Sequence, residues 1–212
     1  MIWYAAYGSN LDRERFHHYL QGGAAPGAQR VLSGARDTSP PVEERAVTFP
    51  GTMFFAWESP TWGGGISFVE VAGLEARSAR TSTTDDVVLA RAYLLTDEQF
   101  SDVAVQEMHR DPEHAADLDL AHVLERRRHT YGPGRYETLH HLGDLDGHPM
   151  LTFTTADRDG LRPNEPRPAY LRLVARGLRD THGLSDAEVA DHLLARPGIG
   201  SWTAAGVRDL LA

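Results

Sequence analysis

The chain has 212 residues, of which 24% are charged, and its formal net charge is −9 at pH 7. This length suits one domain and is enough to bury a core. The acidic balance disfavours nucleic acid and anionic membrane surfaces as partners, and the absence of cysteine excludes disulfides, thiolate catalysis and cysteine-ligated zinc.

Two further properties narrow the class of protein. No apolar run is long enough to span a membrane, and residues 1–4 lack the basic segment that opens a signal peptide. We therefore expect a cytoplasmic protein of bacterial type. All 21 basic residues are arginine, which excludes mechanisms that need a Schiff-base lysine or a phosphate-loop lysine.

The N-terminal segment predicts a strand, a tight turn and a helix. Residues 1–3 are apolar, Gly8-Ser9-Asn10 forms the turn, and residues 12–20 have apolar side chains at helical spacing. Gly8 permits a backbone geometry that a Cβ would block, and Ser9 or Asn10 can cap the helix. The N–H groups at such a helix start attract a carboxylate or a developing oxyanion. On these residues alone, a plain strand-to-helix turn remains the alternative.

The next segments predict an antiparallel arrangement with a glycine-rich loop. Residues 46–49 and 53–57 read as two strands joined by Pro50-Gly51, and residues 66–71 read as a further strand. The loop between them, residues 59–65, contains three consecutive glycines. These glycines could let the backbone approach a ligand, although a plain hairpin loop explains them equally well.

A capping box opens the helix that carries the main catalytic candidate. After a polar loop at 77–86 and a strand at 87–95, Thr96 and Gln99 have the spacing of such a box. The helix that follows has apolar residues at i, i+3 and i+4, and the next position of this stripe is Glu107. A carboxylate at a core position indicates either a functional group or a helix that ends there.

The C-terminal half predicts three further helices and a hairpin. The hairpin pairs residues 136–142 with 149–154 around Asp146-Gly147. A helix at 115–128 is expected to turn Ala116, Leu120, Val123 and Leu124 inward, and a second helix, at 169–178, is expected to bury Leu171, Val174, Ala175 and Leu178. Ser185 and Glu188 form a second capping box, which opens the last helical segment.

These elements predict an α+β fold in which helices are inserted between antiparallel-looking strands. We expect a single domain over residues 1–212, with residues 185–212 as a C-terminal helical closure. The sequence does not fix the oligomeric state, and a homodimer is one of the states that it allows.

Three features suggest other functions and are set aside. Residues 197–204 resemble the helix-hairpin-helix turn that holds a DNA phosphate, but few basic residues surround them, so a structural turn is the better interpretation. The 11 histidines include no H-E-x-x-H pattern, and adjacent pairs such as His17-His18 point in different directions, so we expect no metal site. Ser9 lacks the G-x-S-x-G context of an activated serine nucleophile.

Four segments, taken in order, resemble the signature motifs of the γ-glutamylcyclotransferase-like family. They are Tyr7-Gly8-Ser9-Asn10-Leu11, Trp62-Gly63-Gly64-Gly65-Ile66, Gln106-Glu107 and Pro166-Arg167-Pro168-Ala169-Tyr170. The resemblance spans residues 3–194. It implies a mixed, barrel-like β-sheet with surrounding helices, and an enzyme that converts a γ-glutamyl amide into 5-oxoproline and a free amine.

The resemblance also implies roles for individual residues. Glu107 would be the catalytic general acid and base, and the substrate would be bound by Tyr4, Tyr7, Gly8, Ser9, Asn10 and Tyr170. It implies a small-molecule partner and no cofactor. The chemistry suits one carboxylate, because the substrate's α-amine must lose a proton and the leaving amine must gain one.

The chain departs from the family pattern at two places. Gly63 occupies the position of a histidine in the family's Trp-His-Gly-Gly motif, and residues 108–131 form a longer link than usual, which could cover the pocket. Two alternatives to the cyclotransferase remain: a non-catalytic binding module on the same fold, and an enzyme that removes a γ-glutamyl protecting group from a natural product.

Overall fold

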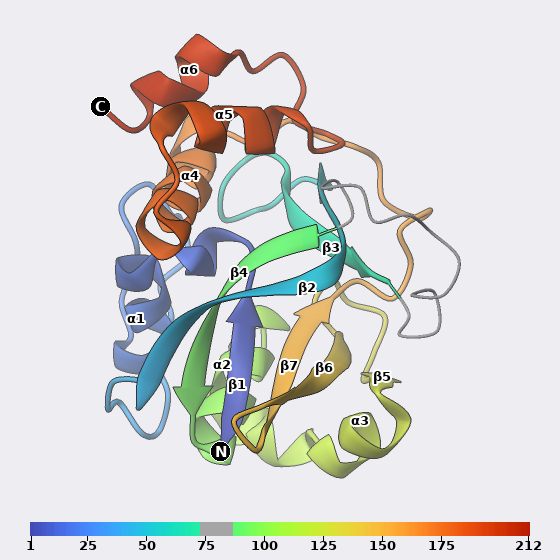
Figure 1. Cartoon of the computed structure of the whole chain (residues 1–212). Coiled ribbons are helices and arrows are strands. Elements are labelled where there is room, and N and C mark those ends of the chain that lie inside the picture. The colour runs from blue at the N-terminus through green and yellow to red at the C-terminus, as the bar shows by residue number, and fades with distance from the viewer. Residues whose placement is uncertain (73–86) are drawn as a thin grey trace.

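The computed structural model describes residues 1–72 and 87–212, except for the side chains of residues 116 and 117. The loop expected at 77–86 therefore lies outside the described residues, as does the side chain of Ala116. The described part is an α+β structure in which one seven-stranded sheet is curled into a half-barrel and is surrounded by helices (Figure 1).

Seven strands form the sheet in the spatial order β3-β2-β4-β1-β7-β6-β5. They are β1 (Ile2–Ala6), β2 (Glu43–Ala56), β3 (Ile66–Val71), β4 (Val87–Leu95), β5 (Arg128–Thr130), β6 (Thr138–Leu145) and β7 (His148–Thr154). The central strand β1 runs antiparallel to β4 and parallel to β7, so the sheet is mixed, as the family resemblance implied.

β2 is one long strand where the sequence predicts two. Its first part, Glu43 to Pro50, pairs with β4, and its last part, Gly51 to Ala56, pairs with β3. Pro50-Gly51 is therefore the point where the strand changes partner and not a turn. A proline has no N–H to give to a ladder, and Gly51 has a φ of 154°, where a Cβ would lie 2.6 Å from the carbonyl oxygen of Glu70.

Six α-helices and two described 3₁₀ segments surround the sheet. They are η1 (Ser9–Leu11), α1 (Arg13–Gln21), α2 (Asp97–Glu107), η4 (Pro112–Asp117), α3 (Leu120–Arg126), α4 (Pro168–His182), α5 (Asp186–Leu194) and α6 (Ala204–Asp209). None of the helices in the described part is both long enough and apolar enough to cross a membrane.

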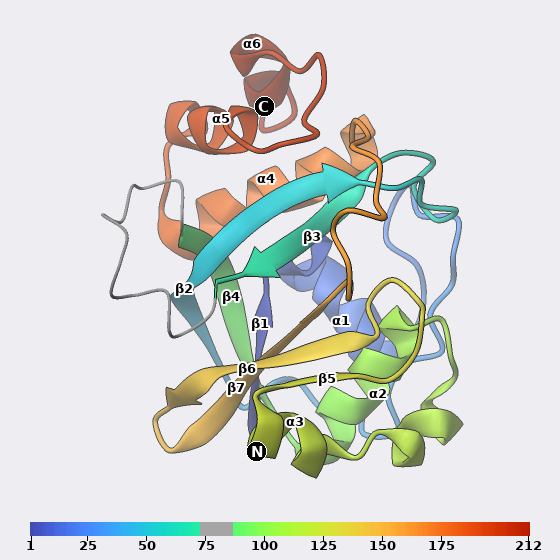
Figure 2. The ribbon, with the colours of Figure 1, turned by 90° about the vertical axis from the view of Figure 1, so that its right-hand side faces the viewer.

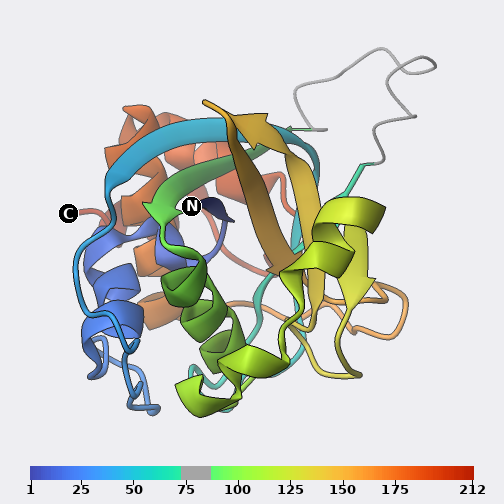
Figure 3. The same ribbon diagram turned by 90° about the horizontal axis from the view of Figure 1, so that it is seen from below.

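The sheet has a hydrophobic core on each face. One core holds side chains of β2, β3 and α4–α6, and the other holds side chains of α1 and α2. β1 contributes side chains to both cores, because alternate residues of a strand point to opposite faces. Tyr4 belongs to the α1–α2 core and Ala5 to the α4–α6 core. Figures 2 and 3 show β2 and β3 beside α4–α6, and α1 and α2 together on the other face.

The helix starts confirm both predicted capping boxes and correct one other cap. The boxes of Thr96–Gln99 and Ser185–Glu188 are both formed. Neither Ser9 nor Asn10 caps α1, because both belong to η1. The cap is Asp12, whose Oδ1 accepts a hydrogen bond of 3.0 Å from the Arg15 backbone N–H.

The helix predicted at 115–128 is shorter and starts later. Asp111-Pro112 is followed by η4, and the true helix α3 covers only Leu120–Arg126. Val123 is buried as expected, whereas Leu124 is 37% exposed, so its predicted inward orientation is wrong. By contrast, the hairpin of β6 and β7 turns at Asp146-Gly147, and the predicted apolar stripe of α4 is buried.

Candidate functional site

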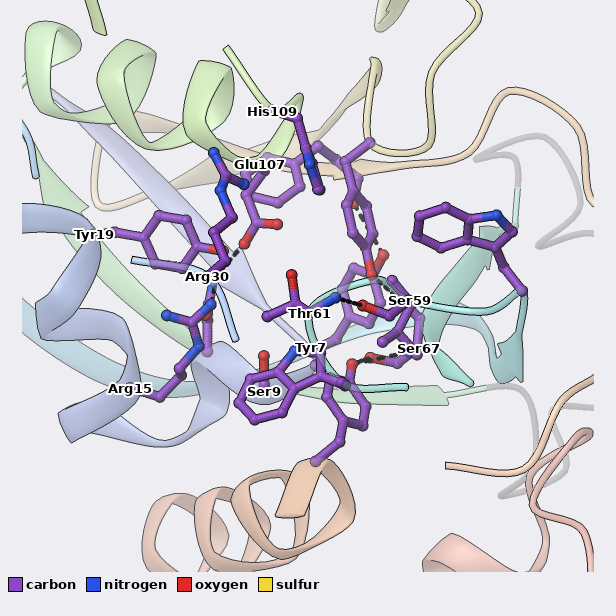
Figure 4. A pocket seen from close by; sticks show the side chains of 18 of the residues that line it. Tyr7, Ser9, Arg15, Tyr19, Arg30, Ser59, Thr61, Ser67, Glu107 and His109 are labelled. Atoms are coloured by element: carbon purple, nitrogen blue, oxygen red, sulfur yellow. Dashed lines mark hydrogen bonds between the residues drawn. The ribbon is translucent and has the colours of Figure 1, made fainter. Parts of the chain in front are cut away.

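A pocket lies where the β1–α1 turn, the end of α2, the loop after β2 and the start of α4 meet (Figure 4). It contains about 600 Å³ of space free of protein atoms, part of which is open to solvent. All seven residues predicted for the site line this pocket: Tyr4, Tyr7, Gly8, Ser9, Asn10, Glu107 and Tyr170. Segments more than 160 residues apart in sequence thus contribute to one cavity wall.

Glu107 is the last residue of α2 and is only partly buried. The buried stripe of Phe100, Val103 and Ala104 stops before it, because the helix ends at Glu107 and Met108 is its C-cap. Glu107 therefore does not sit in the core, as the stripe suggested, but extends its carboxylate into the pocket. Its Oε1 accepts a hydrogen bond of 2.8 Å from Asn10 Nδ2.

Asn10 connects the β1–α1 turn to that carboxylate. Its Nδ2 donates to Glu107 and also, over 3.2 Å, to the hydroxyl of Tyr4. The backbone carbonyl oxygen of Asn10 accepts a hydrogen bond of 2.8 Å from the Tyr93 hydroxyl on β4, which anchors the turn to the sheet. Since Asn10 is only 4% exposed, this network fixes the position of the Glu107 carboxylate.

Gly8 has a φ of −106° and a ψ of −141°, and the prediction that a Cβ would not fit at this position is confirmed by its surroundings. A Cβ on Gly8 would lie 2.4 Å from Ser67 Oγ and 3.1 Å from the Tyr170 hydroxyl. These two hydroxyl groups are hydrogen-bonded to each other over 2.5 Å, and the Tyr170 oxygen also accepts a hydrogen bond from the Ser67 backbone N–H. The turn therefore packs directly against the pocket wall.

Tyrosine hydroxyls form much of the wall, and they stay protonated. Burial raises the pKa of Tyr4 and of Tyr19, and the nearby Glu107 charge raises both further. Burial also raises the pKa of Tyr7, whose hydroxyl donates to the Phe153 carbonyl over 3.0 Å. The wall thus has neutral hydroxyls, and Glu107 is the one acidic side chain among the described residues that line it.

Sequence reasoning missed two arginines of the pocket, Arg15 and Arg30. Arg15 is on α1 and is 5% exposed, although its position before Phe16 gives no sign that it is buried. The one available signal is its i, i+4 spacing from Tyr19, whose hydroxyl accepts a hydrogen bond of 3.2 Å from Arg15 Nη2. Arg30 donates over 2.8 Å to the Gln106 carbonyl at the end of α2.

The sequence allows residues 108–131 to cover the pocket. Among the described residues of this segment, His109 alone lines the cavity, so the described part does not form such a cover. Burial and the Arg30 charge lower the pKa of His109, while Glu107 opposes the shift, so this imidazole is mainly neutral at pH 7. In the part of the chain that is described, no three His, Cys, Asp or Glu side chains are grouped closely enough to hold a metal ion.

No family model matches the chain. It is 30% identical over 213 residues to histone deacetylase 5 of Arabidopsis thaliana, and the match covers 91% of this chain but only 30% of that protein. Because the chain spans less than a third of that relative, the activity in the relative's name is not transferred to it.

A solved structure, described as a γ-glutamyl cyclotransferase from yeast that is specific to glutathione, is also similar. The alignment covers 99% of this chain and 95% of the yeast chain, with 14% identity and a TM-score of 0.34. A TM-score of this size supports no argument about activity. The assignment of function therefore rests on the pocket itself.

Proposed function

We propose that the chain converts a γ-glutamyl amide into 5-oxoproline and a free amine. The observation that carries this proposal is the Glu107 carboxylate, held by Asn10 at 2.8 Å, in a pocket that also contains the Gly8-Ser9 turn. The pocket thus combines one fixed proton acceptor with backbone groups suited to bind negative charge.

In the proposed reaction, both protons pass through Glu107. The carboxylate takes a proton from the substrate's α-ammonium group, and the resulting amine attacks the γ-carbonyl carbon of the same molecule. A new C–N bond forms, and the carbonyl becomes a tetrahedral oxyanion. At this stage the attacking nitrogen carries two hydrogens and a positive charge. Glu107 gives its proton to the leaving nitrogen as the original amide bond breaks. It then takes the second proton from the ring nitrogen and passes it to the released amine, which leaves as an ammonium ion, so the enzyme ends in its starting state.

Holding the substrate in a folded conformer is the second requirement. The attack is intramolecular, so the main contribution of the protein is to bring the amine and the carbonyl together. In the proposal, N–H groups of the Gly8-Ser9 turn bind the substrate carboxylate or the oxyanion. The neutral hydroxyls of Tyr4 and Tyr170 would complete the wall, and no cofactor takes part in the reaction.

Release of 5-oxoproline from a panel of γ-glutamyl-amino acids and γ-glutamyl-amines tests the proposal. We expect turnover of at least one member, measured by chromatographic detection of 5-oxoproline. The matched chemical control is the corresponding α-glutamyl compound, in which the amide bond is at the α-carbonyl, so closure of the five-membered ring would not break it. Binding without turnover would favour the alternative of a non-catalytic binding module.

A further inference from the structure

Arg15 is a buried cation without an anionic partner. It is 5% exposed, and among the described residues no carboxylate oxygen lies within 4.0 Å of its guanidinium group. Its Nη2 donates to the neutral Tyr19 hydroxyl, and its Nε is buried without any hydrogen-bond partner in the described structure. A buried charge is unfavourable unless it is paired.

Aromatic rings hold this guanidinium in place. The central carbon of the guanidinium group, Cζ, lies 4.7 Å from the centre of the Tyr19 ring and 5.7 Å from the centre of the Trp62 ring. Such contacts favour a cation and restrict the orientation of its planar donors. Since Arg15, Tyr19 and Trp62 all line the pocket, the cation is fixed at the wall where a ligand would bind.

The pocket wall has two chemically different ends, and Figure 4 shows Glu107 between them. At one end, Gly8 packs against Ser67 and Tyr170. At the other end are Arg15 and Tyr19, with Arg30 on the same side in Figure 4. Because the proposed reaction places both reacting nitrogens at Glu107, the glutamyl half and the amine half must extend from it toward different ends.

The charges of the pocket indicate which substrate fits. With His109 neutral, Arg15, Arg30 and Glu107 leave one net positive charge among the lining residues. A γ-glutamyl-amine is a zwitterion without net charge, whereas a γ-glutamyl-amino acid or γ-glutamyl-peptide has one additional carboxylate. Once the turn has bound the carboxylate of the glutamyl half, only a γ-glutamyl-amino acid or γ-glutamyl-peptide has a further carboxylate for Arg15.

We propose that the amine half of the substrate carries a carboxylate, and that Arg15 binds it with Arg30 as the outer contact. The inference rests on the proposed function and specifies its substrate class as γ-glutamyl-amino acids or γ-glutamyl-peptides. Arg15 is thus a specificity residue that acts on the leaving group. Arg30 is less buried and already bonded to Gln106, so its contribution is smaller.

A matched pair of substrates tests this assignment. γ-Glutamyl-alanine and γ-glutamyl-ethylamide differ only in the carboxylate of the amine half. We expect wild-type kcat/KM to be about 10- to 100-fold higher for γ-glutamyl-alanine, as for the loss of one charged hydrogen-bonded contact. Arg15→Met should remove this preference by raising KM for γ-glutamyl-alanine, and should leave kcat/KM for the ethylamide within about threefold.

Three variants complete the design. Arg15→Lys keeps the charge without the planar donors and should recover part of the preference. Arg30→Gln should reduce the preference more weakly, and it remains informative if Arg15→Met does not fold. Arg13→Met is the matched control, because Arg13 lies on the same helix but pairs with Glu44 outside the pocket.

The outcomes separate the inference from the proposed function. Equal losses of kcat/KM for both substrates in Arg15→Met would show that Arg15 binds the glutamyl half. Equal wild-type kcat/KM values for the two substrates would also overturn the inference.

If neither compound releases 5-oxoproline, the proposed function fails, and calorimetric Kd values for the same pair then decide the inference. Tighter binding of γ-glutamyl-alanine, lost in Arg15→Met, supports it, and equal or absent binding overturns it.

Discussion

The Gly8–Asn10 turn and the turn at 197–204 have similar sequences but different surroundings. Each places glycine next to a short helical segment, and each could bind an anion on that basis. The turn at 197–204 is filled by the protein itself: Glu165 Oε2 accepts hydrogen bonds from the N–H and the hydroxyl of Ser201, over 2.7 and 2.9 Å. The Gly8–Asn10 turn lines the pocket and contacts Glu107 through the Asn10 side chain.

The difference shows that a local motif specifies donors but not what they bind. The anion at the second turn comes from a residue 36 positions earlier in the chain. Gly198 in that turn also packs against the backbone of Phe55, whose N–H donates to the Pro197 carbonyl over 2.7 Å. A filled turn contributes to stability, whereas an open turn is available to a ligand.

Glu107→Gln should have the largest effect, because it removes the proposed proton carrier from the open site. The amide can still accept the hydrogen bond from Asn10, so the fold should be retained. We expect 5-oxoproline formation to fall by at least about 1,000-fold, within the range for loss of a general acid–base. Steady-state kinetics and a thermal melt measure the two quantities.

Glu98→Gln is the control for that variant. Glu98 lies on the same helix, is half exposed and pairs with Arg36 over 3.3 Å, away from the pocket. Its replacement should leave activity within about twofold, as expected for an exposed ion pair. If Glu107→Gln turns over substrate normally, Glu107 is not the base and is only the last residue of its helix.

Gly8→Ala should damage the open turn by displacing its neighbours. The added Cβ would lie 2.4 Å from Ser67 Oγ, so the turn or the Ser67–Tyr170 pair must shift. A displacement near 1 Å can reduce kcat/KM by about 100-fold, and we expect a loss of roughly that order. In a Ser67→Ala background the contact is absent, so adding Gly8→Ala should cause a smaller further loss. Equal losses in both backgrounds would contradict this steric explanation.

Gly198→Ala should affect stability and not catalysis. Gly198 has a φ of +84°, and a Cβ there would lie 1.8 Å from the Phe55 carbonyl oxygen, a backbone atom. We expect the free energy of unfolding to fall by about 2 kcal/mol or more, equivalent to a Tm decrease of about 4–8 °C. Activity per folded molecule should be unchanged. A selective loss of activity without a lower Tm would connect this turn to the site.

Glu165→Gln should have the smallest effect, and the effect should depend on pH. Hydrogen bonds from the Ser201 N–H and hydroxyl lower the pKa of Glu165, so the group stabilises the fold above its unfolded pKa of about 4.3. This contribution is lost as pH falls through the lower, folded pKa. Because Glu165 is exposed, we expect about 1 kcal/mol or less at pH 7.

Urea unfolding of wild type and Glu165→Gln at pH 7 and near pH 3 measures that contribution. The difference in unfolding free energy between the two proteins should be largest at pH 7 and should shrink on acidification. A difference that is independent of pH would mean that the carboxylate charge does not stabilise the turn.

The sequence predicts features that depend on neighbouring residues. The two capping boxes and the β6–β7 hairpin follow from local spacing, and the family resemblance adds the residues that meet at the pocket. Features that need distant partners were missed. The continuity of β2 depends on its change of partner from β4 to β3, and the burial of Arg15 depends on Trp62, 47 positions away.

The parallel pairing of β1 with β7 has a consequence for synthesis of the chain. Trp3 and Tyr4 pair with Met150 and Leu151, so one edge of the first strand finds its partner only after some 150 residues have been made. At about 5–20 residues per second, that edge stays open for roughly 7–30 s. An unpaired edge is a template for pairing with other chains. Nascent chains are therefore most exposed to aggregation during this interval, before the strand that completes the sheet and supports the pocket emerges.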